Sequence, residues 1–280
     1  MKLLVTGATG FIGSHFVNAA HQAGHELHCI RRAESRPRIT LEKEPNWYFG
    51  SLDDDWSKIL KECDTIIHLA AHSTNVPYDT LESCLYWNLT VTLKLMEQAR
   101  ISGIKKFIVA GTGFEYGKAG ERYEKIPVDA PLEPTMTYPA SKAVAAVALT
   151  QWTMEHKLKL KYIRIFQVFG EGEAASRLWP SLKKAAEAGE DFQLTPGEQV
   201  RDFTPVELVA TQLVEALNFK KVKVGIPYIS HVGTGEPKTL REFAEYWWKQ
   251  WGATGKLHFG SQPYRQNEVM RFVPQIKRIN

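Results

Sequence analysis

The segment Thr6-Gly7-Ala8-Thr9-Gly10-Phe11-Ile12-Gly13 follows a short apolar run (residues 3–5) and opens a helical pattern. Its glycines, spaced three apart, fit a strand that turns sharply into a helix. Gly7 permits the turn, Gly10 lets the backbone approach a pyrophosphate, and Gly13 allows close helix packing. The start of the helix adds free N–H groups and a positive dipole end. We expect the dinucleotide-binding residues here to be Gly7, Thr9, Gly10, Phe11, Ile12 and Gly13.

Short β-branched runs alternate with longer helical patterns through the first half of the chain. Such alternation predicts βαβ units, in which helices cover both faces of a parallel sheet. The expected fold class is therefore α/β, a doubly wound Rossmann sheet with a smaller, mixed C-terminal substrate lobe. Strand patterns lie at residues 3–5, 26–30, 65–67, 107–109 and 162–166, and helical patterns lie at 11–23, 81–100 and 139–156.

The second half of the chain has a different pattern, with loops rich in glycine and proline. Helical patterns cover residues 171–189, 206–217 and 240–251, and a strand pattern covers 227–230. We expect a dinucleotide-binding domain at 1–165 and a substrate-binding lobe at 166–280. The segment near 200–232 can return to the first sheet, which would make the substrate lobe discontinuous in sequence.

Length and composition restrict the possible functions. The 280 residues suffice for two domains, and 44% of them are hydrophobic. The net charge of +4 is too small a surplus to indicate nucleic-acid binding. No stretch approaches the roughly 20 apolar residues of a membrane span. The 3 cysteines form no CxxC pair, so we expect no metal site and a reducing, cytoplasmic location.

Several separated motifs resemble one known family. The opening TGATGFIGSH resembles that of the extended short-chain dehydrogenase/reductases, which remodel nucleotide-activated sugars. The resemblance covers nearly the whole chain and implies an enzyme that uses NAD(P) on a nucleotide-diphosphate sugar. It also implies cofactor contacts at Leu69, Ala70, Ala71 and Asn88. The other matching motifs are Ile66–Ala71, Tyr138–Lys142, Arg164–Gly170, Arg201–Phe203 and Gly233–Gly235.

A Tyr–Lys pair is the candidate catalytic group. Tyr138 and Lys142 are four residues apart near the start of a helix that Pro139 suits, so the ammonium can lie near the phenol. A neighbouring cation favours the phenolate, which predicts an acid or base active near neutral pH. Thr112 ends a predicted strand, where a hydroxyl can hydrogen-bond the reacting carbonyl oxygen. The resemblance gives Lys142 a second role, in holding the nicotinamide ribose.

Departures from the family pattern narrow the reaction. Family dehydratases carry Asp-Glu directly after the catalytic Thr, but this chain has Gly113 and Phe114, which transfer no protons. The epimerase-reductase of GDP-fucose synthesis has Cys at the position of Phe114. A ketoreductase and a 4-epimerase acting by transient oxidation remain. A non-catalytic NADP-sensing regulator is a third hypothesis, which the presence of Tyr138 and Lys142 disfavours.

The end of the second strand indicates the cofactor. NAD-binding relatives carry Asp or Glu there, to accept from the ribose 2′-hydroxyl. This chain has Arg31 followed by Arg32, and a guanidinium matches a 2′-phosphate. We therefore expect NADP(H) rather than NAD(H), which favours reduction of a 4-keto, 6-deoxy nucleotide sugar. Ser51 and Leu52 stand where relatives contact adenine.

The resemblance also implies a substrate site and an assembly. The expected partners of the diphosphate are Arg177, Arg201 and Arg265, because a guanidinium can engage phosphate through two hydrogen bonds. Helices at 88–100 and 142–153 have small or apolar faces that pair across a twofold axis in similar proteins, so we expect a homodimer. The expected substrate contacts are His72, Thr112, Gly113, Phe114, Gln167, Arg177, Leu178, Arg201 and Arg265.

Overall fold

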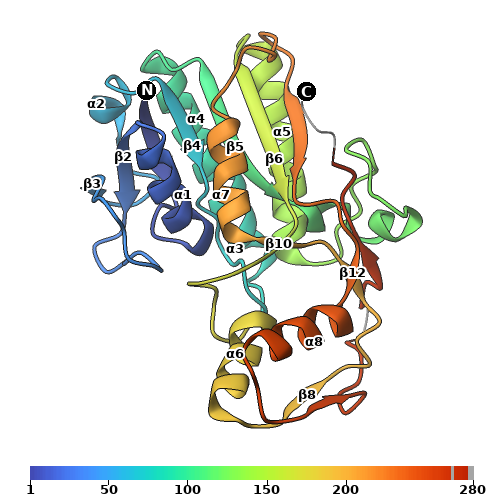
Figure 1. Ribbon diagram of the computed structural model, residues 1–280. Coiled ribbons are helices and arrows are strands. Elements are labelled where there is room, and N and C mark those ends of the chain that lie inside the picture. The colour runs from blue at the N-terminus through green and yellow to red at the C-terminus, as the bar shows by residue number, and fades with distance from the viewer. Residues whose placement is uncertain (266–267, 277–280) are drawn as a thin grey trace.

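The computed structural model describes residues 1–265 and 268–276 (Figure 1). Its central layer is a parallel sheet of seven strands in the order β11-β6-β5-β4-β1-β2-β3. The strand order reverses between β1 and β4, which creates a crevice at their carboxyl ends. The strands are β1 (Lys2–Thr6), β2 (Glu26–Arg31), β3 (Asn46–Phe49), β4 (Thr65–His68), β5 (Lys106–Thr112), β6 (Lys159–Ile165) and β11 (Tyr228–Val232).

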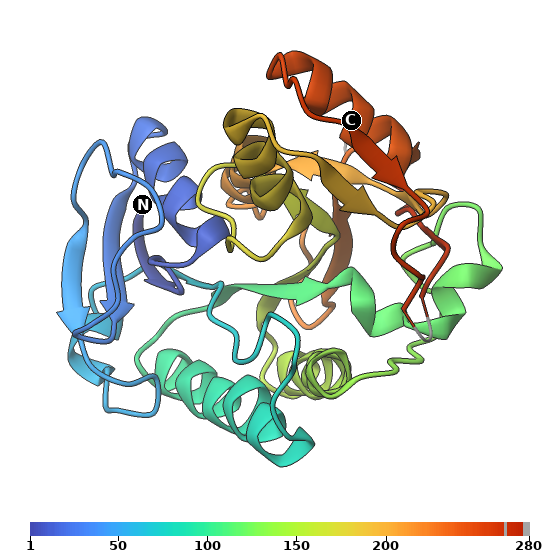
Figure 2. The same ribbon diagram turned by 90° about the horizontal axis from the view of Figure 1, so that it is seen from below.

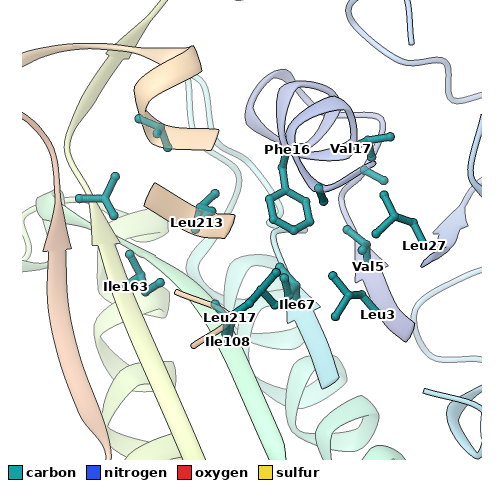
Figure 3. Close-up of a cluster of buried hydrophobic side chains, with 14 of the residues drawn as sticks. Leu3, Val5, Phe16, Val17, Leu27, Ile67, Ile108, Ile163, Leu213 and Leu217 are labelled. Atoms are coloured by element: carbon teal, nitrogen blue, oxygen red, sulfur yellow. The ribbon is translucent and has the colours of Figure 1, made fainter. Parts of the chain in front are cut away.

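Helices cover both faces of this sheet (Figure 2). Helices α1 (Phe11–Gln22) and α7 (Val206–Glu215) pack on one face, and α4 (Thr92–Ile101) and α5 (Thr137–Glu155) pack on the other. Because both faces are buried, the strands are apolar along most of their length. Figure 3 shows Phe16 of α1 and Leu213 of α7 pointing toward the sheet, where both are fully buried.

The helical pattern at 81–100 forms one run with an irregular middle. It consists of α3 (Leu81–Leu85), the π-helical turn η1 (Tyr86–Val91) and α4. A π turn inserts an extra residue into the helix and is frequent at functional sites. Here it carries Asn88 into the interior, where the side chain is 2% exposed.

The chain leaves the sheet after β6 and later returns to it. Strand β11 pairs in parallel with β6, from Tyr228 opposite Lys161 to Val232 opposite Ile165. Helix α7, which precedes it, packs against α1. Residues 206–232 thus contribute to the sheet layer although they follow part of the second lobe in sequence.

The second lobe lies beyond the carboxyl ends of the strands (Figure 1). Helices α6 (Leu178–Ala188) and α8 (Leu240–Gln250) enclose its apolar cluster, in which Trp248 is 9% exposed. Its small strands are β8 (Phe192–Leu194), β9 (Val200–Arg201), β12 (Lys238–Thr239), β13 (Leu257–Phe259) and β14 (Arg271–Phe272). The remaining elements are β7 (Gln167–Phe169), β10 (Phe203–Pro205), α2 (Ser57–Leu60), η2 (Gly113–Tyr116) and η3 (Lys118–Arg122).

One prediction at the level of elements was wrong, and one strand of the central sheet was missed. The helix expected from Glu171 begins only at Leu178, because Gly170 and Gly172 adopt φ values of +146° and +83° in the preceding turn. Strand β3 was not predicted, since its residues Asn46–Phe49 include no β-branched side chain, unlike those of the equally short β4. Within the described part of the chain, no helix combines the length and apolar character needed to cross a membrane.

Candidate active site

The glycine loop joins β1 to α1 at the crevice. Gly7 has φ +74°, and a Cβ there would lie 2.5 Å from the backbone nitrogen of Ala70. A Cβ on Gly13 would collide with the Gly7 carbonyl, so both glycines serve contacts within the protein. A Cβ on Gly10 would meet only the Gly7 oxygen, at 3.1 Å. Gly10 is the N-cap of α1, which has no side-chain cap and no acidic residue in its first turn. These features suit an anionic ligand.

The end of β4 lies beside the glycine loop because β1 and β4 are neighbours. Residues Leu69, Ala70 and Ala71 follow this strand directly. The N–H of Ala70 donates to Thr6 Oγ1 at 3.4 Å. The structure therefore brings two of the expected cofactor-binding segments together.

Arg31 is the last residue of β2 and stacks on aromatic rings of β3. Its guanidinium carbon lies 4.5 Å from the ring centroid of Trp47 and 4.8 Å from that of Phe49. Its Nη1 donates to the Ser35 carbonyl at 3.1 Å, whereas its Nε is buried without a hydrogen-bond partner. In the described part of the chain, no carboxylate forms an ion pair with Arg31. Arg32 differs, because it is exposed and its Nε lies 3.3 Å from Glu34.

The expected adenine contacts follow β3. The N–H of Ser51 donates to Asp54 Oδ2 at 2.7 Å, and its hydroxyl donates to Asp53. Leu52 packs against the core on the α4 side of the sheet. The hydroxyl of Ser51 is therefore already hydrogen-bonded within the turn after β3. Leu52 is the apolar residue of the two expected adenine contacts.

Tyr138 and Lys142 both lie in the first half of α5 and are 9% and 2% exposed. The ring of Tyr138 lies 5.5 Å, centroid to centroid, from the ring of Tyr78, which comes from the loop after β4. Thr112, at the carboxyl end of β5, is 7% exposed. The three expected catalytic residues thus lie on two elements that pack together, since η2 continues β5 and contacts α5.

The protonation of the pair differs from expectation. Burial raises the pKa of Tyr138 well above its ordinary value, and the negative charge of Glu115 raises it further. Burial lowers the pKa of Lys142 to about 8, against the opposing effect of Glu115. The expected depression of the Tyr138 pKa by Lys142 is therefore wrong, because burial and the charge of Glu115 both act in the opposite direction. Tyr138 is a neutral phenol there, which suits a proton donor.

Glu115 holds the loop that carries Thr112. The Thr112 N–H donates to Glu115 Oε1 at 2.8 Å, and the Phe114 N–H donates to Thr112 Oγ1 at 3.3 Å. This reciprocal capping fixes the start of η2. The hydroxyl of Thr112 thus sits in a defined place near α5.

Asn88 and His72 have protein partners. Asn88 accepts from the His72 N–H at 2.7 Å and donates to Ser141 Oγ at 2.9 Å. His72 Nε2 lies 2.8 Å from Asp79 Oδ2, and Ser83 also contacts this nitrogen. Asn88 therefore ties the loop after β4 to α5, and His72 closes that loop on itself.

Two of the expected substrate arginines lie near Tyr78. Burial raises the pKa of Tyr78, and the positive charges of Arg177 and Arg265 act in the opposite direction. Arg265 is exposed, whereas Arg177 contacts Glu173 through Nε at 3.3 Å. Tyr78, whose ring contacts Tyr138, thus feels the positive charges of both arginines.

Arg201 is held by the C-terminal segment. Its Nη2 donates to Glu268 Oε1 at 2.8 Å and to the Val269 carbonyl. Strand β14 pairs in parallel with β9, which carries Arg201. Burial lowers the pKa of Arg201, and Glu268 opposes that effect. A diphosphate bound at Arg201 would have to share the guanidinium with the carboxylate of Glu268.

The other expected substrate residues line the same end of the sheet. Gln167 begins β7, in register with Phe203 of β10. Gly113 lies against the ring of Phe166, and Phe114 stacks on Phe272 with ring centroids 5.4 Å apart. Leu178 begins α6 and packs against the apolar cluster of the second lobe.

Sequence reasoning missed three residues of this site: Tyr78, Glu115 and Glu268. Tyr78 lies in an irregular loop without periodicity. Glu115 has one usable signal, because a lone acid in the apolar run before Tyr116 predicts a buried partner. Glu268 gave no signal, since its partner Arg201 is 67 residues away.

The doubly wound sheet with a glycine loop between β1 and α1 is typical of Rossmann-type enzymes that use a nicotinamide dinucleotide. The chain belongs to the NAD dependent epimerase/dehydratase family, whose model matches residues 3–228. The expected resemblance to the extended short-chain dehydrogenase/reductases is thereby confirmed. The expected α/β class, with a doubly wound parallel sheet, is confirmed as well.

Individual relatives have different activities. A UDP-glucose 4-epimerase of Corynebacterium glutamicum is 25% identical over 266 residues, which cover 88% of this chain and 79% of that protein. A CDP-abequose synthase of Salmonella muenchen is 26% identical over 273 residues, which cover 96% and 87%. The solved UDP-glucose 4-epimerase of Thermus thermophilus, in complex with NAD, is 26% identical, with TM-score 0.81 over 98% of this chain and 90% of that one. The family therefore includes more than one nucleotide-sugar reaction.

Proposed function

We propose that this protein reduces a 4-keto, 6-deoxy nucleotide sugar with NADPH. The observation that carries the proposal is the environment of Arg31. A guanidinium stacked on Trp47 and Phe49, with an unpartnered Nε, occupies the end of β2. NAD-binding sites have a carboxylate at this place, and a guanidinium instead favours a 2′-phosphate. NADPH is the form that cells use for reductions.

The residues present fit such a cofactor. The uncapped start of α1 faces the crevice, and Gly10 leaves room for backbone contact with a pyrophosphate. Leu69, Ala70 and Ala71 border the same crevice beside β1. When bound, a nicotinamide supplies hydride to a sugar carbon.

The chain's own residues handle the proton. Tyr138, a buried neutral phenol, donates its proton to the carbonyl oxygen as that oxygen becomes an alcohol. Thr112 offers a hydroxyl to the same oxygen. Lys142, with a pKa near 8, supplies positive charge that stabilises the resulting phenolate, and Tyr138 regains its proton from solvent. Gly113 and Phe114 offer no second acid or base, which supports a bare hydride step.

Replacement of Arg31 tests the cofactor. We expect the wild-type protein to bind NADPH at least about tenfold more tightly than NADH. Arg31→Asp should remove or reverse this preference, because a carboxylate repels the phosphate and accepts from a 2′-hydroxyl. Calorimetry with each dinucleotide measures both affinities. Arg241→Asp, an equal charge change in the second lobe, is the control and should leave the ratio unchanged. Equal wild-type affinities would contradict the cofactor assignment.

A 4-epimerase is the second candidate, and two of the three named relatives have that activity, whereas the third is a CDP-abequose synthase. An epimerase retains its cofactor, so nicotinamide absorbance shows no net change during turnover. A reductase consumes NADPH in proportion to product. The test therefore follows absorbance after addition of a nucleotide-linked 4-keto-6-deoxyhexose. Retained NAD⁺ in the purified protein, with no NADPH consumption and with formation of the 4-epimer from UDP-glucose, would establish the epimerase instead.

A further inference from the structure

A charged group lies beneath the catalytic residues without touching the crevice. Glu115 is 0% exposed and belongs to η2, one turn after Thr112. Its carboxylate accepts from the Thr112 N–H at 2.8 Å, from Tyr162 Oη at 2.9 Å and from Arg164 Nε at 2.7 Å. A buried carboxylate with three good donors is a fully built site, because each donor offsets part of the cost of losing water.

Arg164 forms an ion pair with Glu115, and its guanidinium is held as firmly as that carboxylate. Arg164 Nη1 donates to Tyr116 Oη at 2.7 Å and to the Val128 carbonyl at 3.0 Å. Its side chain is 4% exposed. Buried ion pairs of this kind add little net stability compared with apolar residues of the same size. The ion pair of Glu115 and Arg164 is therefore more important for the arrangement of the catalytic residues than for the net stability of the fold.

Glu115 reaches all three candidate catalytic residues by short paths. It holds Thr112 directly, through the backbone. It reaches Lys142 through Tyr162, whose hydroxyl also lies 3.1 Å from the Lys142 carbonyl. It reaches Tyr138 through its electric field, since its negative charge raises the pKa of Tyr138 as well as that of Lys142.

We propose that Glu115 is a positioning residue, which fixes Thr112 at the end of β5 and, through Tyr162, holds that strand end against the turn of α5 that carries Lys142. Its negative charge also favours the protonated form of Lys142. The proposal rests on the proposed function for its catalytic consequence, whereas its effect on Lys142 holds in the ligand-free protein. Arg164 balances the charge of Glu115, so the pair contributes a fixed dipole with its negative end toward α5.

The other groups near this network are few. Tyr116 and His231 lie on the Arg164 side, and their side chains are 2.6 Å apart. Tyr78 and Cys84 act on Tyr138 from the loop after β4 and from α3. Asp129 also acts on Tyr116, and burial and the charge of Arg164 both lower the pKa of His231.

Glu115→Gln tests the proposal, because it keeps the shape and removes the charge. The titration of Lys142 is followed by NMR of the protein labelled with ¹³C-lysine, with the signal assigned through Lys142→Arg. In the wild type we expect a midpoint near pH 8. In the variant we expect it about one unit lower, since loss of the anion and the unpaired Arg164 both disfavour an ammonium. Asp202→Asn, which alters a buried carboxylate held by Thr234, should leave the midpoint unchanged.

Activity supplies the second readout. The basic limb of kcat against pH should move to lower pH in Glu115→Gln by the same amount, which lowers the rate above that limb about tenfold. KM for the nucleotide sugar should change little, because Glu115 does not face the crevice. If the unpaired Arg164 prevents folding, Glu115→Gln with Arg164→Met removes both charges, and the Lys142 midpoint should still fall.

Each outcome decides between the hypotheses. An unchanged Lys142 midpoint in a folded variant overturns the role of Glu115, whatever the activity. A lowered midpoint in a protein that consumes no NADPH supports the effect of Glu115 on Lys142 and removes the proposed reductase function. A fall in stability without any change in the titration or the pH profile would show that Glu115 is only structural.

Discussion

Tyr138 is buried, with its ring against Tyr78, and burial raises the pKa of its phenol. A phenol in such a place gives up its proton only when a stronger base appears beside it. The alkoxide that forms as a ketone accepts hydride is such a base. The high pKa of Tyr138 therefore fits donation during reduction better than abstraction in the reverse direction.

Tyr138→Phe should lower turnover by about 10² to 10⁴, the usual contribution of general acid–base catalysis. Folding and cofactor binding should survive, because only the hydroxyl is lost. Thr112→Val should cost less, since it removes one polarising hydrogen bond. Steady-state kinetics with a ketosugar, together with cofactor titration, measure both effects. Near wild-type turnover in Tyr138→Phe would show that another residue donates the proton.

The low pKa of His68 predicts how the free energy of unfolding depends on pH. This residue is 1% exposed, its nitrogens contact Thr6 and Thr92 hydroxyls at 2.8 and 3.2 Å, and burial lowers its pKa to about 3. As pH falls below about 6.5, the imidazole of His68 therefore binds a proton in the unfolded state before it does so in the folded state. His68 should therefore contribute stability above that pH that is lost between about 6.5 and 3, on the order of 5 kcal/mol in full.

Denaturant unfolding of wild type and His68→Gln across that pH range measures this loss. Glutamine keeps a donor and an acceptor but does not titrate. The difference in unfolding free energy between the two proteins should shrink as pH falls. A constant difference would argue that His68 does not resist protonation. The comparison of the two proteins removes the common contribution of acidic groups such as Asp79.

At the scale of elements, the sequence predicts those features that depend on residues close together in the chain. The glycine loop, the alternation of strands and helices, and the spacing of Tyr138 and Lys142 are all visible within short windows. Pairings across long separations are not. Arg164 meets Glu115 from 49 residues away, and the sequence, which indicated that the segment near 200–232 can return to the sheet, did not indicate β6 as the partner of β11. The protonation of Tyr138 was mispredicted for the same reason, because the distant Glu115 and the depth of burial determine it.

The pairing of β9 with β14 holds Arg201, the predicted diphosphate contact, against Glu268 and Val269. Arg201→Ala should weaken nucleotide-sugar binding about ten- to a hundredfold, the value of one charge-assisted contact. NADPH binding should change little, because Arg201 lies outside the glycine-loop crevice. Calorimetry with each ligand separately measures both, and Arg241→Ala is the control in the same lobe. Equal losses for the two ligands would indicate that Arg201 only anchors Glu268 and Val269.

At the scale of the whole molecule, one face of α5 lacks a cover. Val144, Val147 and Met154 are 46%, 63% and 52% exposed and share a helical face. Tyr86 and Ile101 add apolar surface from η1 and α4. Exposed apolar residues on neighbouring helices suit a symmetric interface between two copies.

Val147→Glu should therefore shift a homodimer toward monomers, because two buried carboxylates would face one another across a twofold axis. Sedimentation velocity over a range of concentrations measures the assembly. Lys157→Glu, just beyond the end of α5, is the control for added negative charge. A wild-type protein that sediments as a monomer at all concentrations would contradict the dimer.

The late return of β11 to the sheet affects how the protein is made. On the ribosome, β6 emerges well before Tyr228–Val232, and until then it is an edge strand with unpaired backbone groups. A nascent chain of this length is exposed to chaperones and to strand-by-strand association with its neighbours. Lys159 and Lys161 lie on that temporary edge. Their charges can discourage such association until α7 and β11 arrive, after which Lys161 donates to the Asn218 carbonyl at 2.8 Å.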